Sequence, residues 1–214
     1  MNRIVIVCAG PIKNYKKIRK YLRNDDYFIF CDGGLFHQKS LKVAPDMIIG
    51  DFDSYNKNPA ILQKKYKNCK IITLPKEKDD TDSIYASKKA MELKPTEVIL
   101  LGAVGNRFDH SMANISILIN LFNNGIDCKL IDDFSIMQIV EKEEVKISKE
   151  YSFFSLINIS GTCEGIDIKN AMYPLDNGTI NCNYQYGISN QVLKGKEYST
   201  VSVKNGCGLL IMDF

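Results

Sequence analysis

The sequence lacks the features that mark several large classes of protein. No apolar run approaches the roughly 20 residues that a membrane-spanning helix needs. The apolar run at residues 3–9 is short and passes into a turn and a basic stretch, so we expect a first β-strand there rather than a signal peptide. The formal net charge is only +3, and no dense basic block is present. We therefore expect neither a membrane nor nucleic acid as a partner.

Metal-binding and disulfide spacings are also missing. The seven cysteines are scattered without a C-x-x-C pair, and there are only two histidines. This pattern favours reduced thiols in a cytoplasmic protein over a disulfide framework or a zinc site. No G-x-x-x-x-G-K-[ST] stretch occurs, which argues against a P-loop kinase. A hydrophobic content of 45% with 25% charged residues predicts a globular chain with a substantial core.

The first part of the chain alternates β-like runs with helical patterns. The β-like runs are 3–9, 27–31, 47–49, 70–74, 97–101 and 128–131, and the helical patterns are 14–22, 59–67, 82–93 and 109–123. This alternation predicts an α/β domain over residues 1–133, with a mostly parallel, Rossmann-like sheet covered on both faces.

The second part of the chain has a different pattern, with short β-like runs in which apolar and polar residues often alternate and which Gly, Asn and Lys separate. These runs are 135–140, 144–147, 152–158, 163–168, 178–182, 191–194, 197–203 and 208–213. No helix of ordinary length fits among them, so the pattern predicts an all-β sandwich over residues 134–214.

Each polar cluster of the first part follows a predicted strand. The clusters are "CDGG" (31–34), "GDFDS" (50–54), "KEKDDTD" (76–82) and "GAVGNRFDH" (102–110). Taken singly, each is an ordinary turn or helix cap. Ligands of an open parallel sheet bind at the carboxyl ends of its strands, so we expect all four clusters to converge at one rim.

The clusters are rich in carboxylates. They bring Asp32, Asp46, Asp51, Asp53, Asp79, Asp80, Asp82 and Asp109. Asp51 and Asp53 would point the same way on an extended chain. Carboxylates crowded at one rim repel one another unless a cation neutralises them. Hard oxygen ligands with little histidine predict Mg²⁺ rather than zinc at this rim.

The same rim supplies partners for phosphate. These are Gly33, Gly34, Gly102, Gly105, Lys78 and Arg107. The glycines permit close backbone approach, Arg107 offers a planar fork and Lys78 a point charge. Asp109 and His110 open a predicted helix whose first amides can also face phosphate, although capping is an equal alternative for His110. Mg²⁺ beside phosphate partners indicates a nucleotide polyphosphate as the ligand.

The ordered set of motifs resembles the thiamine pyrophosphokinase family. The motifs are "DGG" (32–34), "PDMIIGDFDS" (45–54), "KDDTD" (78–82), "GAVGNRFDH" (102–110) and "GISN" (187–190), and they cover nearly the whole chain. The resemblance implies a catalytic α/β domain and a thiamine-binding β-sandwich, working as a homodimer with active sites between subunits. It implies transfer of the terminal pyrophosphoryl group of ATP to the thiamine hydroxyl, which gives thiamine diphosphate and AMP.

The resemblance also implies roles for individual residues. Asp51, Asp53 and Asp82 match the metal-binding and catalytic carboxylates, and Asp79 is a further metal candidate. The residues expected around the nucleotide are Asp32, Gly33, Lys78, Asp79, Thr81, Arg107, Asp109 and His110, with Arg107 also catalytic. Asp32 matches the substrate-side aspartate, and Ser189 and Asn190 match the thiamine-side pair. We hypothesise that Asp82 or Asp51 orients or deprotonates the thiamine hydroxyl.

Three features depart from the family pattern. Cys31 stands where a small residue such as alanine is common, and Asn106 stands where a second glycine is frequent. The chain has no tryptophan, on which some members stack the thiamine ring. Tyr184 or Tyr186 is a candidate for this aromatic face, with the sandwich core as the alternative place for both.

Two rival functions stay open on the sequence alone. A Mg²⁺-dependent nucleotide hydrolase would use the same acidic rim with water as acceptor, but it would not need the "GISN" segment. A non-catalytic nucleotide-binding sensor would have little reason to gather so many carboxylates. Thiamine-dependent release of AMP separates both from the pyrophosphokinase.

Overall fold

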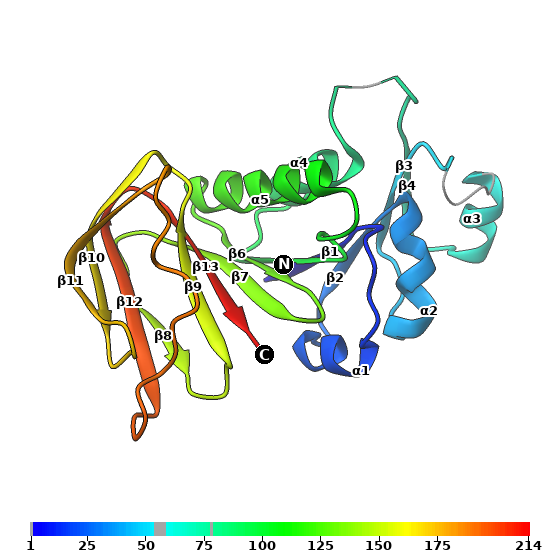
Figure 1. The fold of residues 1–214 in the computed structure, drawn as a ribbon. Helices are drawn as coiled ribbons and strands as arrows, with labels where there is room; N and C mark the ends of the chain where they lie inside the picture. Colours follow the sequence, from blue (N-terminus) through cyan, green and yellow to red (C-terminus); the bar gives the residue numbers. More distant parts are fainter. Residues whose placement is uncertain (1, 54–58, 78) are drawn as a thin grey trace. The chain divides into compact units, whose positions relative to one another are not determined.

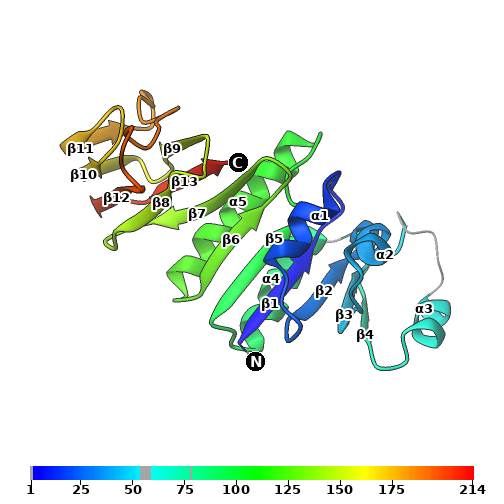
Figure 2. The same ribbon diagram turned by 90° about the horizontal axis from the view of Figure 1, so that it is seen from below.

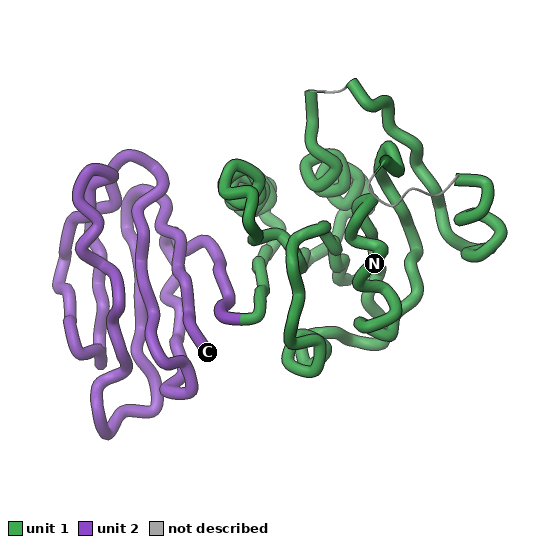
Figure 3. Tube along the Cα trace, turned by 45° about the vertical axis from the view of Figure 1, so that its right-hand side comes forward, with its two compact units in different colours: residues 1–133 green, residues 134–214 purple. Residues whose placement is uncertain are grey.

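The computed structural model describes every residue of the chain except 1, 54–58 and 78 (Figure 1). The chain divides into two compact units, residues 1–133 and residues 134–214 (Figure 3). The first is an α/β unit and the second consists of antiparallel strands, so the predicted fold class is confirmed. Within the described residues, no helix has the length and apolar character needed to cross a bilayer.

Parallel strands form the sheet of the first unit. They are β1 Arg3–Val7, β2 Tyr27–Cys31, β3 Met47–Gly50, β4 Lys70–Thr73, β5 Glu97–Leu101 and β6 Asp127–Ile131. Within this unit their order is β4-β3-β2-β1-β5-β6 (Figure 2). The strand order reverses between β1 and β5, which is the position where open α/β sheets bind ligands.

Helices cover both faces of this sheet. They are α1 Tyr15–Ile18, η1 Arg19–Tyr21, η2 Asp32–His37, α2 Gln38–Leu41, α3 Pro59–Lys65, α4 Asp82–Glu92 and α5 Phe108–Asn123. α4 and α5 lie on one face, and α1 and α2 lie on the other (Figures 1 and 2). Because both faces are covered, every residue of β1 is buried, as expected for a parallel sheet.

The segment that begins with "DGG" is helical and does not form the turn that its sequence suggests. A 3₁₀ helix, η2, starts at Asp32 and continues directly into α2. Gly34 lies so close to β1 that a Cβ atom would be 2.2 Å from the carbonyl oxygen of Val7. The glycine therefore permits η2 to pack against the central strand.

The second unit is a sandwich of two antiparallel sheets. Its strands are β7 Ser135–Val140, β8 Val145–Ser148, β9 Phe153–Asn158, β10 Thr162–Lys169, β11 Leu175–Asn181, β12 Tyr198–Asn205 and β13 Gly208–Asp213. β13 pairs with β7 and β9, and the second sheet has the order β11-β10-β12-β8. Leu156 and Val203 come from different sheets and both approach the bare backbone of Gly208 in the core.

The predicted strand at residues 191–194 is wrong. Val192 forms only an isolated bridge with Ala171, and Leu193 is 44% exposed. Single backbone bonds hold this segment, from the Met172 amide to the Gln191 carbonyl (2.9 Å) and from the Leu193 amide to the Asn170 carbonyl (2.8 Å). Its apolar pair suggested a strand, but the ladder does not extend far enough to form one.

Candidate active site

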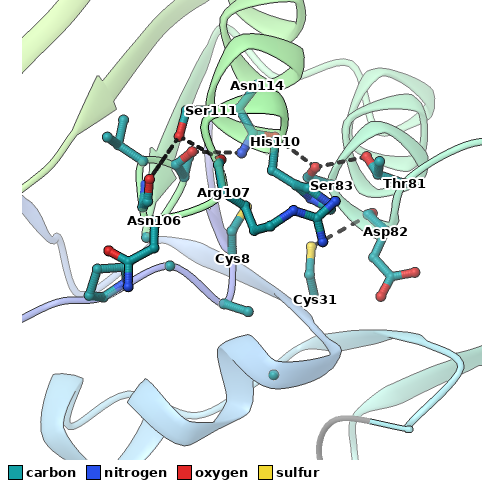
Figure 4. Close-up of a pocket in the computed structure, with 18 of the residues that line it drawn as sticks. Cys8, Cys31, Thr81, Asp82, Ser83, Asn106, Arg107, His110, Ser111 and Asn114 are labelled. Carbon is teal, nitrogen blue, oxygen red and sulfur yellow. Dashed lines mark hydrogen bonds between the residues drawn. The ribbon is translucent and has the colours of Figure 1, made fainter.

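A cavity of about 490 Å³ opens at the carboxyl ends of β1, β2 and β5. Its lining comes from residues 8–11, 31–33, 81–83 and 102–107 and from His110, Ser111 and Asn114 (Figure 4). These segments follow β1, β2 and β5 or begin α4 and α5. The cavity therefore lies at the reversal of strand order and joins three of the four polar clusters.

Two glycines bring the loops after β1 and β5 together. The Gly10 amide donates to the Gly102 carbonyl at 2.7 Å. A Cβ on Gly10 would lie 2.4 Å from that same oxygen, and Gly102 has a positive φ of 59°. Neither position accepts a side chain without displacement, so glycine is required where these loops form the cavity wall.

A buried polar chain fixes the start of α4 against the loop after β5. The Asn114 amide nitrogen donates to the Ala103 carbonyl at 2.7 Å, and its oxygen accepts from the Ser83 hydroxyl at 2.7 Å. Ser83 in turn lies 3.1 Å from the hydroxyl of Thr81, which caps α4. The sequence interpretation missed Ser83 and Asn114, although a polar residue within the buried stripe of α5 was the available signal.

Three aspartates from neighbouring strand ends meet at the rim. One carboxylate oxygen from each of Asp32, Asp51 and Asp53 lies within 4.8 Å of the others. Asp32 is buried, Asp51 is half-buried and Asp53 is exposed. The three come from the segments after β2 and β3, so the predicted convergence of these two clusters is observed.

The backbone between Asp51 and Asp53 is not extended, contrary to the sequence expectation. Phe52 has a φ of +61° and its side chain is only 5% exposed. A left-handed conformation is unusual for a bulky residue and strains the chain. Burial of the Phe52 ring accompanies this turn, and the Asp53 amide donates to the Asp51 carboxylate at 3.2 Å.

This trio has the donor chemistry of a hard-cation site. It offers carboxylate oxygens alone, without histidine or cysteine, and such ligands suit Mg²⁺. The sequence assigned Asp32 to the nucleotide and the substrate and did not include it among the metal ligands; in the structure its carboxylate lies with those of Asp51 and Asp53. Asp32 is also a cavity-lining residue, so it connects the acidic trio with the cavity.

Asp82 lies on the cavity wall and outside the trio. It is the first residue of α4, and its Oδ1 atom is buried. The Cys31 thiol donates to the Asp82 backbone carbonyl at 3.7 Å (Figure 4). Burial and a hydrogen bond with Cys8 raise the pKa of Cys31, with the Cys8 bond as the larger cause, so this thiol stays protonated.

The remaining acidic candidates fall in different places. Asp79 is exposed in the loop before α4, and Asp80 forms an ion pair with Lys88 at 2.5 Å. Asp46 precedes β3, at the opposite end of the strand from the rim, and its carboxylate accepts from the Phe28 amide at 2.8 Å. Counting Asp46 in the acidic rim was therefore wrong. Lys78 lies outside the described residues.

Arg107 and Asp109 form a bidentate ion pair at the cavity mouth. The Arg107 Nε donates to Oδ1 of Asp109 at 3.0 Å, and an Nη donates to Oδ2 at 2.6 Å. Hydrogen bonding to Arg107 lowers the pKa of Asp109 to about 2, although both side chains are exposed. His110 follows in the first turn of α5 and also lines the cavity. The Arg107 guanidinium, which we expect to bind phosphate, thus lies next to the cavity, and the Asp109 carboxylate is its hydrogen-bond partner there.

In the second unit, Ser189 and Asn190 have different environments. Ser189 is exposed with a φ of +58°, and its amide donates to the Ser155 hydroxyl at 3.0 Å. Asn190 is 3% exposed, and its amide nitrogen donates to the Tyr173 carbonyl at 2.7 Å. Its oxygen accepts from the amides of Tyr173 (3.0 Å) and Gln191 (2.9 Å). The Asn190 side chain therefore holds two loops together.

Tyr184 and Tyr186 are surface residues of this unit. Their rings lie 5.5 Å apart between centroids, and the side chains are 69% and 40% exposed. The Tyr186 hydroxyl donates to the Thr179 carbonyl at 2.7 Å. Neither ring belongs to the sandwich core, which removes one of the two alternatives left by the sequence.

The fold and the rim define an open parallel-sheet α/β protein, with a cavity at its strand-order reversal and an acidic trio beside it, joined in one chain to a β-sandwich. The chain belongs to the thiamine pyrophosphokinase family. Residues 18–130 match the family described as "Thiamin pyrophosphokinase, catalytic domain". Residues 138–208 match "Thiamin pyrophosphokinase, vitamin B1 binding domain". The resemblance seen in the sequence motifs is thereby confirmed.

Individual relatives agree over the full length. The thiamine pyrophosphokinase of Bacillus subtilis (strain 168) is 27% identical over 213 residues, which cover 99% of this chain and 98% of that protein. A crystal structure of the B. subtilis protein superposes with a TM-score of 0.87 at 26% identity, covering 99% of both chains. The Geobacillus thermodenitrificans thiamin pyrophosphokinase gives a TM-score of 0.83 at 25% identity, covering 99% of this chain and 97% of that one.

Proposed function

We propose that this chain transfers the terminal pyrophosphoryl group of ATP to the hydroxyl of thiamine, giving thiamine diphosphate and AMP. Membership of the family supports this reaction. The observation that carries the proposal is the double position of Asp32, which lines the cavity and belongs to the acidic trio. A nucleotide in the cavity would thus have its phosphates next to a cation site.

Mg²⁺ fits the trio, and Asp32, Asp51 and Asp53 are the residues that would hold it. Bound there, the ion would neutralise charge on the polyphosphate oxygens. Asp82, on the cavity wall, is proposed as a further carboxylate facing the same phosphates and the metal. Asp79, in the loop before α4, is proposed as an additional metal ligand. Asp51, Asp53, Asp82 and Arg107 form the proposed catalytic set.

The protein groups supply positioning and proton transfer, and no covalent nucleophile is required. The thiamine oxygen bonds to the β-phosphorus of ATP while the bond from that phosphorus to the α-phosphate oxygen breaks, which releases AMP. Asp82 or Asp51 accepts the proton of the thiamine hydroxyl. Arg107, with a fixed fork of N–H donors, stabilises the phosphate charge once the phosphate competes with Asp109.

The nucleotide is proposed to lie along the glycine-lined wall of the cavity. Gly33, Thr81 and His110 line it and are proposed to contact the nucleotide. Asp109 orients the Arg107 guanidinium at the mouth of the cavity. Lys78 is proposed as an additional phosphate partner on the basis of the family motif. Glycine backbone permits the close approach that a polyphosphate needs.

We also propose that the chain works as a cytoplasmic homodimer whose second unit presents Ser189 to thiamine, with Asn190 fixing the Ser189 loop. Exposed Tyr184, Tyr186 and Ile188 next to Ser189 support a binding role for this surface. Mixing an inactive Asp51→Asn protein with an inactive Ser189→Ala protein tests a shared site. Activity restored on mixing supports shared sites, and sedimentation at the monomer mass contradicts the dimer.

The reaction itself is tested by incubating the purified protein with ATP, Mg²⁺ and thiamine and separating the products by chromatography. The proposal predicts equal amounts of AMP and thiamine diphosphate and no AMP without thiamine. Phosphate release that does not depend on thiamine would indicate a hydrolase. ATP binding without any product would indicate a nucleotide sensor.

A further inference from the structure

The buried side chain of His37 bonds a residue that lines the cavity, although His37 does not line the cavity itself. His37 ends η2, and it is 8% exposed. Its Nε2 atom lies 2.9 Å from the carbonyl oxygen of Gly10, and its Nδ1 atom lies 2.8 Å from the hydroxyl of Tyr15. The Tyr15 and His37 ring centroids are 5.9 Å apart. Both ring nitrogens are thus occupied, one of them by a residue that lines the cavity.

The chemistry of the two partners assigns the protons. A carbonyl oxygen only accepts, so Nε2 of His37 carries the proton given to Gly10. Burial lowers the pKa of His37, while the Gly10 bond and the charge of Asp133 oppose that shift more weakly. The ring is therefore neutral near pH 7, and its Nδ1 accepts the hydroxyl proton of Tyr15.

Gly10 is held on several sides. Its amide donates to the Gly102 carbonyl at 2.7 Å, while its own carbonyl accepts from His37. Further along the same loop, the amides of Lys13 and Asn14 donate to the Asp133 carboxylate at 2.7 and 2.8 Å. Among these bonds, the one from His37 joins the Gly10 loop to η2, whose first residues, Asp32 and Gly33, also line the cavity. The helix η2 also begins with Asp32 of the acidic trio.

We propose that His37 is a positioning residue for the nucleotide, an inference that rests on the proposed function. It fixes the spacing between the Gly10 wall of the cavity and the Asp32 end of η2. A ligand that spans both places, with its phosphates near the acidic trio, binds well only when this spacing is kept. Thiamine should depend on the bond less than ATP does, because thiamine is also proposed to contact Ser189 of the second unit.

The test compares His37→Leu, which removes the donor, with His37→Gln, whose amide nitrogen can occupy the position of Nε2. We expect His37→Leu to raise the KM for ATP roughly five- to tenfold, the effect of one lost hydrogen bond, with a smaller change in kcat. The KM for thiamine should change less than the KM for ATP. His37→Gln should restore most of the ATP affinity. Tyr66→Phe is the matched control, since its hydroxyl bonds Gln38 at 3.1 Å, next to His37, without touching the cavity wall.

Calorimetric titration with Mg²⁺ and a nonhydrolysable ATP analogue makes the result independent of turnover. A purely structural role would lower the melting temperature of His37→Leu while leaving the affinity of the folded fraction unchanged, and that result overturns the inference. Equal loss in His37→Gln and His37→Leu also overturns it. If His37→Leu does not fold, His37→Ala, which also lacks the donor, is compared with Tyr66→Phe, and wild-type analogue affinity in His37→Ala contradicts the inference. Absence of AMP formation by the wild-type protein would instead refute the proposed function.

Discussion

Gly50, the last residue of β3, lies directly against Asp32, which follows β2. A Cβ placed on Gly50 would be 2.6 Å from the Cβ of Asp32, far inside the normal contact distance of two carbon atoms. The absence of a side chain at Gly50 therefore allows Asp32 to lie beside Asp51 and Asp53. Backbone packing between two strand ends thus sets the geometry of the acidic trio.

Gly50→Ala should displace Asp32 and impair the cation site. We expect kcat/KM to fall roughly tenfold to a hundredfold, because small displacements of reacting groups are costly, and more Mg²⁺ should be needed for half-maximal rate. Steady-state assays over a Mg²⁺ series measure both quantities. Gly178→Ala is the control, since its nearest neighbouring atom would be at 3.4 Å. An unchanged Mg²⁺ dependence in Gly50→Ala would show that Asp32 does not contribute to the site.

Arg107→Lys should weaken use of ATP although the charge is kept. Lysine cannot offer two parallel N–H donors to one phosphate, so we expect kcat/KM for ATP to drop roughly tenfold to a hundredfold. Arg19→Lys serves as the control, because Arg19 is a surface residue that bonds the Ser40 carbonyl. Equal kinetics for the two variants would remove Arg107 from the catalytic set.

Folding stability should depend on pH through His37. Burial lowers the pKa of His37 below the ordinary value of about 6.5. The unfolded chain then binds a proton at a pH where the folded protein does not. The stabilising contribution is complete above about pH 6.5 and declines as the pH falls towards the lowered folded pKa. Urea unfolding of wild type and His37→Gln should therefore give a difference that narrows between about pH 7.5 and pH 5.5. A difference that widens over this range would contradict a neutral buried ring.

The end of the sheet opposite the rim should affect stability and leave catalysis intact. Arg3 begins β1, and its guanidinium donates to the Asp26 carboxylate at 2.7 and 2.8 Å with both residues buried. Asp26→Asn removes the closest carboxylate from a buried guanidinium and leaves Glu97, at 3.8 Å, as its charged partner, so we expect a loss of about 3 kcal/mol in the free energy of unfolding. Urea unfolding measures this loss. The folded variant should keep the wild-type KM for ATP. A large rise in that KM would contradict the expectation that this end of the sheet affects stability without affecting the site.

The sequence predicted the strand ends well, because apolar runs followed by polar clusters are a strong signal for a parallel sheet. That topology predicted that the segments carrying Asp32, Asp51 and Asp53 would meet, but it did not predict that the three carboxylates would form one cluster. Placing Asp32 in the trio depends on the close approach at Gly50, which is a tertiary contact. The left-handed turn at Phe52 was also hidden, since local preference disfavours it and burial of the ring is known only from the fold.

Three other features of the structure could not be read from the sequence, for related reasons. "DGG" favours a turn by local statistics, yet packing of Gly34 against β1 allows a helix there. Asn190 matched a ligand-side motif, and only the structure shows that its side chain bonds the Tyr173 backbone. His37 carried no sequence signal, because neither Gly10 nor Tyr15 is near it in the chain.

The most direct test of the account is a titration with Mn²⁺, a paramagnetic substitute for Mg²⁺, in the presence of a nonhydrolysable ATP analogue. Electron paramagnetic resonance would measure Mn²⁺ affinity in wild type, in Asp32→Asn, Asp51→Asn and Asp53→Asn, and in the control Asp176→Asn on exposed β11. The account predicts that each trio variant weakens Mn²⁺ binding about tenfold or more, as for loss of a charged ligand, while the control binds as wild type. Wild-type affinity in all three trio variants would contradict it.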